Sequence, residues 1–391
     1  MKKKNILMIN NFYQIGGGEH TVFKNEVKML KKYGHNVITY TKYNDELKKM
    51  KVKRVFLPFT TIWSFKTYRE IKKIIKENNI EIVHCHNTFP LISPSVYYAS
   101  RSLKIPVIQT IHNFRFLCPA GVFYHNGEIC EKCKDNKSFK YALKNKCYRN
   151  SKLQTAVVVS MLKIHRLLGT YKKISYIFLT EFNKNKFSDL INIKNENIYI
   201  KPNFVKKIKS EDNLIQSSNK FVFAGRLEES KGIKFLLRSW KELNKDYKLH
   251  IYGDGNLKDY VEDFAKKNSN IEYMGFKSQE EIFKDLSESK ALIFSSNLYE
   301  GYPMIIAEAF STGIPVVSSN IGNQKDIIEK SKGGCLFELD NIQSFKESIR
   351  NIIINFEEYS NNSKKYYDKC LSEEYNYRLL EGIYEKAKHI D

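Results

Sequence analysis

The stretch Glu300-Gly301-Tyr302-Pro303-Met304-Ile305-Ile306-Ala307-Glu308 follows an apolar run at 291–294 that predicts a buried strand. It leads into a helix that we expect to end near Gly313, and a second strand is expected at 315–318. The stretch therefore lies at the carboxyl end of a parallel strand and at a helix start. Open α/β sheets bind ligands at that edge, and the free N–H groups of a helix start attract anions. The two carboxylates suit the two ends of an extended ligand whose charged middle lies over the helix start.

The length and charge of the chain set broad limits on its class. At 391 residues, with strands and helices alternating to the end, the chain predicts an α/β protein of two domains. The net charge of +22 indicates anionic partners, which include nucleic acid, a phospholipid surface or a phosphorylated substrate. A lysine-rich composition is also typical of proteins from AT-rich genomes, and this alternative stays open.

The N-terminus begins Met-Lys-Lys-Lys and continues into a short apolar run at 5–9. This run is too short for a secretory signal and predicts the first strand instead. No apolar run reaches the length needed to span a bilayer, and seven cysteines in such a chain do not indicate a disulfide framework. We therefore expect a cytoplasmic protein, peripheral on the inner membrane face.

A glycine-rich loop, Gly16-Gly17-Gly18, separates the first strand, expected to end at Asn10, from a helix that Gly34 closes. Its spacing differs from the dinucleotide-binding pattern. Glycines let the backbone approach a phosphate or sugar closely, although such loops are often only turns. Further strands of this half are predicted at 37–40, 52–57, 82–86, 107–111, 176–179 and 198–200, and helices near 65–78 and 93–103.

His112 and Asn113 come directly after the strand predicted at 107–111. A histidine at the carboxyl end of a parallel strand faces the ligand-binding edge, so we expect a role for His112 in the site. The alternative is a structural histidine.

Residues 114–150 interrupt the alternation of strands and helices. This insertion contains Cys118, Cys130, Cys133 and Cys147. The Cys130-x-x-Cys133 pair has the spacing of a zinc knuckle, and the other two cysteines complete a set of four thiolates. The sequence allows either a structural zinc site or free thiols in a folded insertion.

The segment 131–173 carries twelve lysines or arginines and two acidic residues, and it includes an apolar helix expected at 153–168. A basic segment joined to an apolar helix is typical of an interfacial membrane contact. The alternative is a core helix with one solvated face.

Lys201-Pro202-Asn203 is the predicted hinge, because the proline ends a strand and little periodic pattern surrounds it. We therefore expect an N-terminal domain at 1–203 and a C-terminal domain at 204–391, with a polar linker at 206–219. The last helix, at about 373–388, is expected to cross back to the N-terminal domain.

In the C-terminal half, the strand predicted at 221–224 leads into Gly225-Arg226-Leu227-Glu228-Glu229-Ser230-Lys231-Gly232 and then a helix. Two cations at a helix start favour a diphosphate site that needs no metal, although surface cations are common. Gly253 and Gly275 end the next two strands, so four successive strand ends carry glycine or charge. We interpret them as one ligand groove.

These motifs, taken in order, resemble the family 4 glycosyltransferases of GT-B fold over nearly the whole chain. The resemblance rests on the N-terminal glycine loop with Glu19, the Gly225-Arg226 to Lys231-Gly232 loop, Gly253-Asp254-Gly255, the glutamate pair and the run that begins at Gly313. It implies two Rossmann-like parallel-sheet domains that face each other across a cleft. It also implies a retaining, metal-independent transfer of a sugar from a nucleoside-diphosphate sugar, as in bacterial cell-surface polysaccharide biosynthesis.

By this resemblance Arg226 and Lys231 hold the donor diphosphate, Glu300 binds hydroxyls of the transferred sugar, Glu308 binds the ribose diol, and His112 lies near the sugar and acceptor. Pro303 departs from many members, which have a second glycine there, and removes one N–H, so the donor contact depends on the Met304 and Ile305 amides. The expected substrate-binding residues are Gly16, Gly17, Gly18, Asn113, Gly225, Gly253, Gly275, Gly301, Tyr302, Met304, Ile305 and Glu308.

Three functions compete at this point. The first is a sugar transferase acting on a lipid-linked or polysaccharide acceptor at the inner membrane face. The second is another GT-B enzyme, such as a nucleotide-sugar epimerase or a soluble transferase that makes a small glycoside. The third is a non-catalytic nucleic-acid-binding protein, which only the net charge favours.

Overall fold

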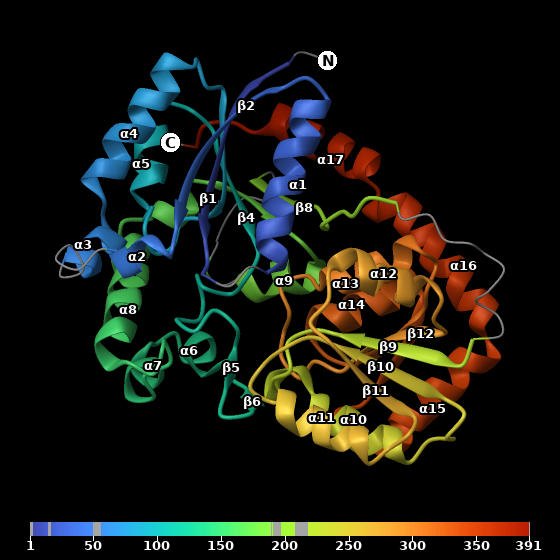
Figure 1. Cartoon of the computed structure of the whole chain (residues 1–391). Helices are drawn as coiled ribbons and strands as arrows, with labels where there is room; N and C mark the ends of the chain where they lie inside the picture. Colours follow the sequence, from blue (N-terminus) through green and yellow to red (C-terminus); the bar gives the residue numbers. More distant parts are fainter. Residues whose placement is uncertain are drawn as a thin grey trace. The chain divides into compact units, whose positions relative to one another are not determined.

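The computed structural model describes residues 3–14, 17–49, 56–188, 190, 197–207 and 218–390. Contacts within the chain divide it into two compact units (Figure 1). The first unit comprises Met1–Phe123, Cys130–Pro202 and Tyr377–Asp391, and the second comprises Tyr124–Ile129 and Asn203–Asn376. The GT-B expectation of two parallel-sheet units is confirmed.

The sheet of the first unit has six strands in the order β2-β1-β3-β4-β7-β8, all parallel. Its strands are β1 (Asn5–Phe12), β2 (Asn36–Tyr43), β3 (Ile82–Asn87), β4 (Val107–Ile111), β7 (Ser175–Phe178) and β8 (Ile198–Ile200). The chain leaves β1 for β2 on one side and returns to β3 on the other. The carboxyl ends of β1 and β3 therefore form the switch point, where open α/β sheets bind ligands.

The helices of this unit pack against the sheet or close its loops. They are α1 (Gly18–Lys32), α2 (Glu46–Lys49), α3 (Leu57–Ile62), α4 (Phe65–Glu77), α5 (Ser95–Arg101), α6 (Lys132–Asp135), α7 (Lys140–Lys144), α8 (Lys152–Leu167), η2 (Thr170–Lys172), α9 (Glu181–Phe187) and most of α17 (Glu373–Lys386). N-cap residues define where some of these helices start. The Ser64 hydroxyl accepts a hydrogen bond from the Thr67 amide at the start of α4, and Thr180 caps α9 in the same way.

One predicted strand of this unit is wrong where the structure describes it. Residues 52–55 of the strand expected at 52–57 lie outside the described residues, and Leu57 begins helix α3 instead. Pro58 at the second helical position favours that helix start, because its fixed φ suits the first turn and its missing N–H is not needed there. The polar linker expected at 206–219 also lies largely outside the described residues.

The second unit contains a parallel sheet of six strands in the order β11-β10-β9-β12-β13-β14. They are β9 (Lys220–Ala224), β10 (Lys248–Tyr252), β11 (Ile271–Gly275), β12 (Ala291–Phe294), β13 (Val316–Ser319) and β14 (Gly334–Phe337). The switch point of this sheet lies between β9 and β12. The two strands that precede the Arg226 loop and the Glu300 loop are therefore direct neighbours.

Helices cover this sheet and enclose a core centred on Trp240, which is fully buried. They are η4 (Glu229–Lys231), α10 (Ile233–Lys241), α11 (Lys258–Lys266), α12 (Gln279–Ser287), α13 (Met304–Ser311), α14 (Gly322–Ser331), α15 (Ile342–Ile354), α16 (Phe356–Tyr366) and η5 (Tyr367–Leu371). The short hairpin of β5 (Tyr124–His125) and β6 (Glu128–Ile129) groups with this unit.

The end of the chain belongs to the first unit from Tyr377 onward. The Tyr377 ring stacks on Tyr33 with a centroid separation of 3.7 Å, and the Tyr384 hydroxyl lies 2.8 Å from Nδ1 of His84. Helix α17 thus completes the interior of a unit that is mostly built from the start of the chain. Among the helices of the described ranges, none has both the length and the apolar character needed to cross a membrane.

Candidate active site

The loops that follow β9 and β12 lie against each other at the carboxyl edge of the second sheet. The Ser295 hydroxyl donates to the Lys231 carbonyl at 2.8 Å, and the Asn297 amide donates to the Ser230 carbonyl at 3.0 Å. The first loop carries Arg226 and Lys231, and the second carries Glu300. The switch point therefore brings together charged residues that lie far apart in the sequence.

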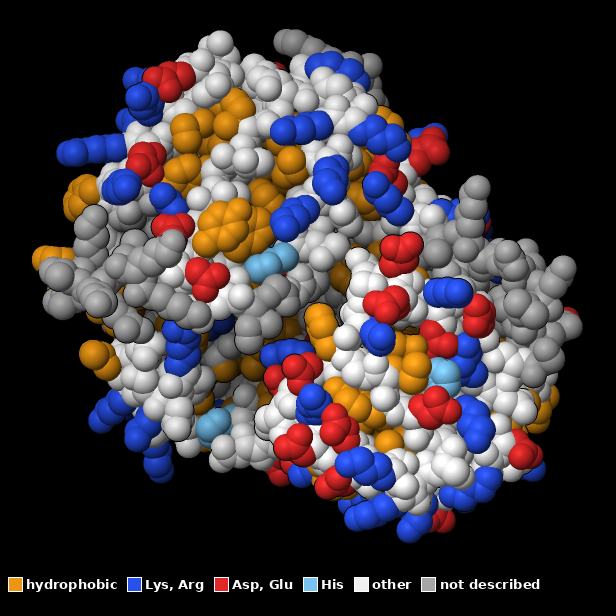
Figure 2. Space-filling view, in the orientation of Figure 1, with side chains coloured by type: hydrophobic (Ala, Val, Ile, Leu, Met, Phe, Trp, Pro, Cys, Tyr) orange, Lys and Arg blue, Asp and Glu red, His pale blue; other side chains and the backbone are white. Residues whose placement is uncertain are grey.

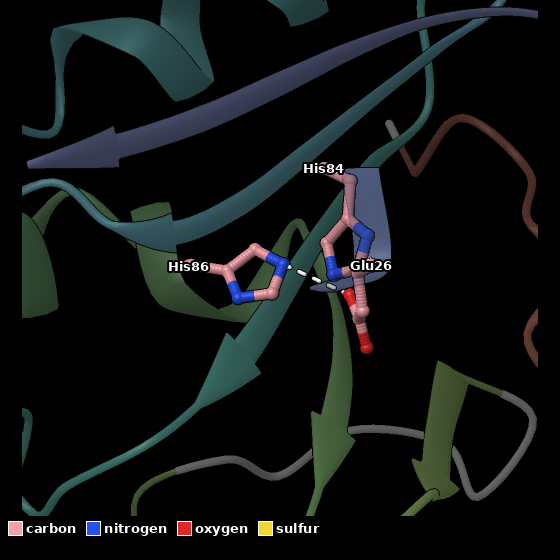
Figure 3. Close-up of side chains that lie close together, drawn as sticks. All are labelled: Glu26, His84 and His86. Atoms are coloured by element: carbon pink, nitrogen blue, oxygen red, sulfur yellow. Dashed lines mark ion pairs between the residues drawn. The ribbon is translucent and has the colours of Figure 1, made fainter. Parts of the chain in front are cut away.

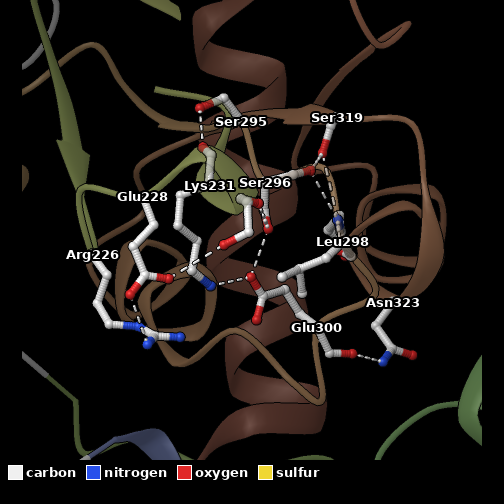
Figure 4. A network of polar contacts seen from close by, with 11 residues as sticks. Arg226, Glu228, Lys231, Ser295, Ser296, Leu298, Glu300, Ser319 and Asn323 are labelled. Carbon is white, nitrogen blue, oxygen red and sulfur yellow. Dashed lines mark hydrogen bonds and ion pairs between the residues drawn. The ribbon is translucent and has the colours of Figure 1, made fainter. Parts of the chain in front are cut away.

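Lys231 and Glu300 form an ion pair at this point (Figure 4). The Lys231 ammonium donates to Oε1 of Glu300, and the Ser296 hydroxyl donates to the same oxygen at 2.7 Å. Both charged side chains are mostly buried, with exposed fractions of 17% and 16%. Two donors on one oxygen hold the carboxylate in position, so it is ordered before any ligand arrives.

Arg226 is more exposed than Lys231 and points toward a different partner. Its Nη1 donates to Oε1 of Glu228 at 3.0 Å, as Figure 4 shows. Because this pair is largely solvated, it holds the guanidinium only weakly, and an anionic ligand can compete for it.

Helix α13 begins at Met304, with Pro303 in extended conformation as its N-cap. The N–H groups of Met304 and Ile305 belong to the first helical turn and have no carbonyl one turn earlier to bind. The Tyr302 ring is buried, so it supports the loop from inside the unit.

Glu308 lies in the second turn of α13 and is only 6% exposed. The side-chain amide of Gln279 donates to its Oε1 at 2.7 Å. Burial raises the pKa of Glu308 to about 7, and the Gln279 hydrogen bond only partly offsets this effect. A carboxyl group in this state gains or loses its charge near neutral pH.

The glycines at the strand ends allow backbone segments to touch. A Cβ at Gly253, whose φ is 140°, would lie 1.8 Å from the Gly225 carbonyl oxygen. The Gly225 amide donates to the Tyr252 carbonyl, and the Gly253 amide donates to the Gly275 carbonyl. These glycines therefore order the edge of the sheet through backbone contacts. Gly301 follows Glu300 in the loop between β12 and α13.

In the first unit, His112 and Asn113 follow β4 as predicted. Nε2 of His112 lies 2.8 Å from Nδ1 of His86, and the Asn113 side-chain oxygen accepts from the Arg115 amide at 3.0 Å. Burial lowers the pKa of His112 well below its ordinary value, so the ring is neutral. These residues line a cavity of about 30 Å³ at the carboxyl end of the sheet.

The glycine loop of the first unit is only partly described. Gly16 lies outside the described residues, Gly17 is the N-cap of α1, and Gly18 is its first residue. A Cβ at Gly17 would meet nothing within 4 Å, so this position is open rather than crowded.

Two family models match consecutive parts of the chain. The family described as Glycosyltransferase Family 4 matches residues 16–206, and the family described as Glycosyl transferases group 1 matches residues 205–369. The chain belongs to the family 4 glycosyltransferases. This assignment identifies an enzyme, so the alternative of a non-catalytic nucleic-acid-binding protein is wrong.

Known proteins similar to this glycosyltransferase carry the same class of name. An uncharacterized glycosyltransferase of Methanocaldococcus jannaschii is 27% identical over 358 residues, which cover 90% of this chain and 89% of that protein. The UDP-Gal:alpha-D-GlcNAc-diphosphoundecaprenol alpha-1,3-galactosyltransferase of Escherichia coli is 26% identical over 313 residues, covering 76% and 74%. The crystal structure of a glycosyltransferase from Rickettsia africae superposes with a TM-score of 0.68 at 18% identity and covers 99% of each chain.

Sequence reasoning missed the residues that hold the Glu300 loop of this glycosyltransferase. The Asn323 side-chain amide donates to the carbonyls of Glu300 and Gly301, the latter at 2.8 Å. The Gln324 side-chain amide donates to the Leu298 carbonyl at 3.1 Å. Both residues lie in the first turn of α14, a few residues after the end of β13. A polar pair in the helix that follows a strand was the available signal, although it lies farther from the strand end than His112 and Asn113 do.

The four cysteines of the insertion are free thiols. Cys118 and Cys133 are buried, and the thiols are near enough to raise one another's pKa. Burial, the larger cause, raises the pKa of Cys133 and of Cys147 to about 11. Within the described part of the chain, however, no three of these sulfur atoms lie within 4.8 Å of one another.

Proposed function

We propose that this glycosyltransferase moves a sugar from a nucleoside-diphosphate sugar to a lipid-linked or polysaccharide acceptor, with retention of configuration and without a catalytic metal. The observation that carries the proposal is the Lys231–Glu300 ion pair at the switch point of the second sheet, beside the start of α13. A cation, a fixed carboxylate and free helix N–H groups suit a sugar diphosphate, whose ring carries hydroxyls and whose phosphates carry charge.

The leaving group explains why cations are needed. The bond between the anomeric carbon and the diphosphate oxygen breaks with its electron pair on that oxygen, so negative charge builds on the diphosphate. We assign Lys231 and Arg226 to the stabilisation of this charge in place of a metal ion. In a retaining front-face reaction, the acceptor hydroxyl bonds to the anomeric carbon on the same face. Its proton passes to the departing phosphate oxygen, so no separate carboxylate base is required.

The two glutamates have different environments and are given different roles. Glu300 is held by Lys231 and Ser296, and we assign it to the hydroxyls of the transferred sugar. Glu308 lies in α13 with Gln279, and we assign it to the ribose diol. His112, in the first unit, is assigned to the sugar and acceptor.

The lipid-linked acceptor is supported by an apolar groove in the first unit. Helix α3 packs against α8, and the groove beside them has a volume of about 240 Å³. Leu57, Pro58 and Val157 contribute apolar walls, and Arg149 adds a positive charge. Such a groove suits a hydrocarbon chain next to a phosphate. The similar Escherichia coli galactosyltransferase is named for a diphosphoundecaprenol-linked acceptor.

The membrane-facing surface is proposed on α3, α4 and α8. Phe59, Phe65, Leu153 and Leu167 on these helices are each at least 70% exposed, within or beside the basic segment 131–173. Exposed apolar side chains combined with lysines are typical of an interfacial contact. Elsewhere, on the face that Figure 2 shows, basic side chains are spread out with carboxylates among them.

Substitution of each glutamate should affect a different kinetic constant. Glu300→Gln should lower kcat by about 10²-fold, the effect of losing one preorganised charged contact, with a smaller effect on nucleotide affinity. Glu308→Ala should mainly raise the donor KM, because ribose contacts are the same in the ground and transition states. Calorimetric titration of UDP, GDP and ADP identifies the base, and steady-state kinetics with that donor then compares the variants.

Glu229→Gln is the matched control, since Glu229 pairs with Lys234 on the exposed surface of the same unit. It should leave both constants unchanged. Loss of nucleotide binding in Glu300→Gln together with normal binding in Glu308→Ala would reverse the assignment. Full activity in both variants would show that the donor does not bind in this groove.

Nucleotide affinity should depend on pH through Glu308. The pKa of its carboxyl is raised to about 7, so the group is mostly protonated at pH 6 and mostly ionised at pH 8. Only the ionised form accepts from both ribose hydroxyls, so affinity should rise about tenfold between pH 6 and pH 8. Calorimetry over this range should show the rise in the wild type and lose it in Glu308→Gln, which also corrects for titration of the nucleotide. Equal pH profiles would exclude this role.

The protein should bind vesicles that contain anionic phospholipid, and the binding should weaken as salt rises. A Leu153→Ser, Leu167→Ser variant should bind about tenfold less tightly, because two apolar side chains no longer enter the interface. Ile354→Ser is the control, since Ile354 is 69% exposed but lies in the second unit. Vesicle sedimentation measures all three proteins, and equal binding to neutral and anionic vesicles would contradict the proposal.

We also propose that the insertion binds a structural zinc ion. The Cys130-x-x-Cys133 pair has the spacing of a zinc knuckle, and Cys118 and Cys147 lie near enough to affect the other thiols. Four thiolates suit zinc. Metal analysis of reduced protein should find about one zinc per chain. The content should fall in Cys133→Ser and persist in Cys370→Ser, whose cysteine lies outside the insertion. Zinc-free wild-type protein would assign these cysteines to packing alone.

A further inference from the structure

A row of four side chains, three of them buried and the fourth, His112, half-buried, connects the end of β8 to the edge of the first sheet. The Lys201 ammonium donates to Oε1 of Glu26 at 2.5 Å, and Oε2 of Glu26 lies 3.1 Å from Nε2 of His86. Nδ1 of His86 then lies 2.8 Å from Nε2 of His112. Figure 3 shows the ion pair between the Glu26 carboxylate and the ring of His86. Lys201 and Glu26 are both fully buried, so this end of the row is shielded from water.

Two residues of this row, Glu26 and His86, form a cluster with His84 that has the composition of a metal site. Glu26, His84 and His86 offer ligand atoms within 4.8 Å of one another. The Lys201 ammonium already occupies the carboxylate, however, and both ring nitrogens of His84 have partners. They lie 2.8 Å from the Tyr384 hydroxyl and 2.7 Å from the Thr110 hydroxyl. A second cation would meet strong repulsion here, so these residues do not fit a metal ion.

The positions of the protons follow from this arrangement. Nε2 of His86 and Oε2 of Glu26 lie 3.1 Å apart in an ion-pair contact that is too bent to be a hydrogen bond. Two lone pairs at this distance would still repel, so this nitrogen carries a proton. Burial alone would raise the pKa of Glu26, but Lys201 and then His86 hold it well below its usual value, so the carboxylate is ionised. Lys201 already balances that charge. A neutral His86 therefore leaves the row without net charge, and its Nδ1 carries a lone pair.

The lone pair on His86 determines the state of His112. In the 2.8 Å contact between the two rings, Nδ1 of His86 can only accept, so Nε2 of His112 must donate. The His112 ring is neutral because burial lowers its pKa well below the ordinary value. Its Nδ1 is therefore unprotonated, and no hydrogen bond to this atom is found in the described parts of the chain.

We propose that Glu26 and His86 are positioning residues that hold His112 in the tautomer whose Nδ1 accepts a hydrogen bond from a substrate hydroxyl. This inference rests on the proposed role of His112 at the transferred sugar or acceptor. This tautomer makes the site selective for a sugar with a free hydroxyl that can donate to Nδ1 of His112, because a deoxy analogue leaves this acceptor unpaired.

Glu26→Gln tests the proposal with little change in shape. Lys201 can only donate, so the glutamine oxygen must face Lys201 and the glutamine NH₂ group must face His86. Nε2 of His86 must then accept, Nδ1 must carry the proton, and His112 must accept at Nε2 and carry its own proton at Nδ1. The substitution thus reverses the donor in both contacts beyond Lys201 and turns the substrate-facing nitrogen of His112 into a donor.

Nitrogen NMR of the histidine rings in the full-length protein reads the tautomers directly. We expect His112 to carry its proton on Nε2 in the wild type and on Nδ1 in Glu26→Gln. The variant should lose about 10²-fold in kcat, as for other preorganised contacts, with a smaller change in donor KM. Removal of the substrate hydroxyl that donates to Nδ1 of His112 should lower kcat more in the wild type than in the variant.

The matched control is Asp285→Asn in the second unit. Asp285 binds Lys220 on one side and Nδ1 of His250 at 2.8 Å on the other, so it repeats the lysine–carboxylate–histidine arrangement away from the proposed site. It should leave kcat and the His112 tautomer unchanged.

A wild-type His112 with its proton on Nδ1 would overturn the proposal, and this measurement remains decisive if Glu26→Gln does not fold. A reversed tautomer with unchanged kcat would also overturn it. Neither result affects the proposed function, which the Glu300 and Glu308 kinetics test separately.

Discussion

Direct contact between backbone loops at the carboxyl edge of the second sheet is the constraint on which the candidate donor site depends. A Cβ at Gly232, whose φ is 67°, would lie 2.0 Å from the Ser295 carbonyl oxygen, and Gly253 approaches Gly225 as closely. Any side chain at these positions would force the loops apart. With glycine, Ser295 reaches the Lys231 carbonyl, and Lys231 reaches Glu300. The charged groups therefore depend on residues that carry no chemistry themselves.

The interior of the first unit follows a different principle, because it contains charge. Lys201 and Glu26 are fully buried, and burial of such a pair costs desolvation energy that the ion pair often only just recovers. Apolar residues of similar size would serve stability equally well. The buried pair instead orders its neighbours. Separation of the two charges would leave each of them uncompensated, so the pair stays together and maintains the geometry of the row through His86. Charge at this depth is therefore better explained by the arrangement it imposes on β3 and β4 than by stability.

The sequence predicted most of the two sheets. The strands at 82–86, 107–111, 221–224 and 291–294 occur almost as expected, because short apolar runs bounded by glycine or charge specify buried parallel strands. The helix expected at 153–168 is α8, whose N-cap Ser151 is a local signal. The prediction was wrong at Leu57, where a proline after the residue outweighed the β-type composition. On α1, Glu26 is fully buried whereas the neighbouring Val27 is only half-buried, which the polarity of the two side chains does not predict.

The sequence by itself determined the class of fold, the family and the residues at the strand ends, because hydrophobic periodicity, glycines and motif spacing are local properties of the chain. Only the tertiary structure decided which of these residues meet. Strand order makes β9 and β12 neighbours and so pairs Lys231 with Glu300. Glu26 is ionised inside the first unit only because Lys201, which the sequence placed in a hinge, folds against it. Charge pairing and burial depend on contacts between residues distant in sequence, so no local pattern in the sequence records them.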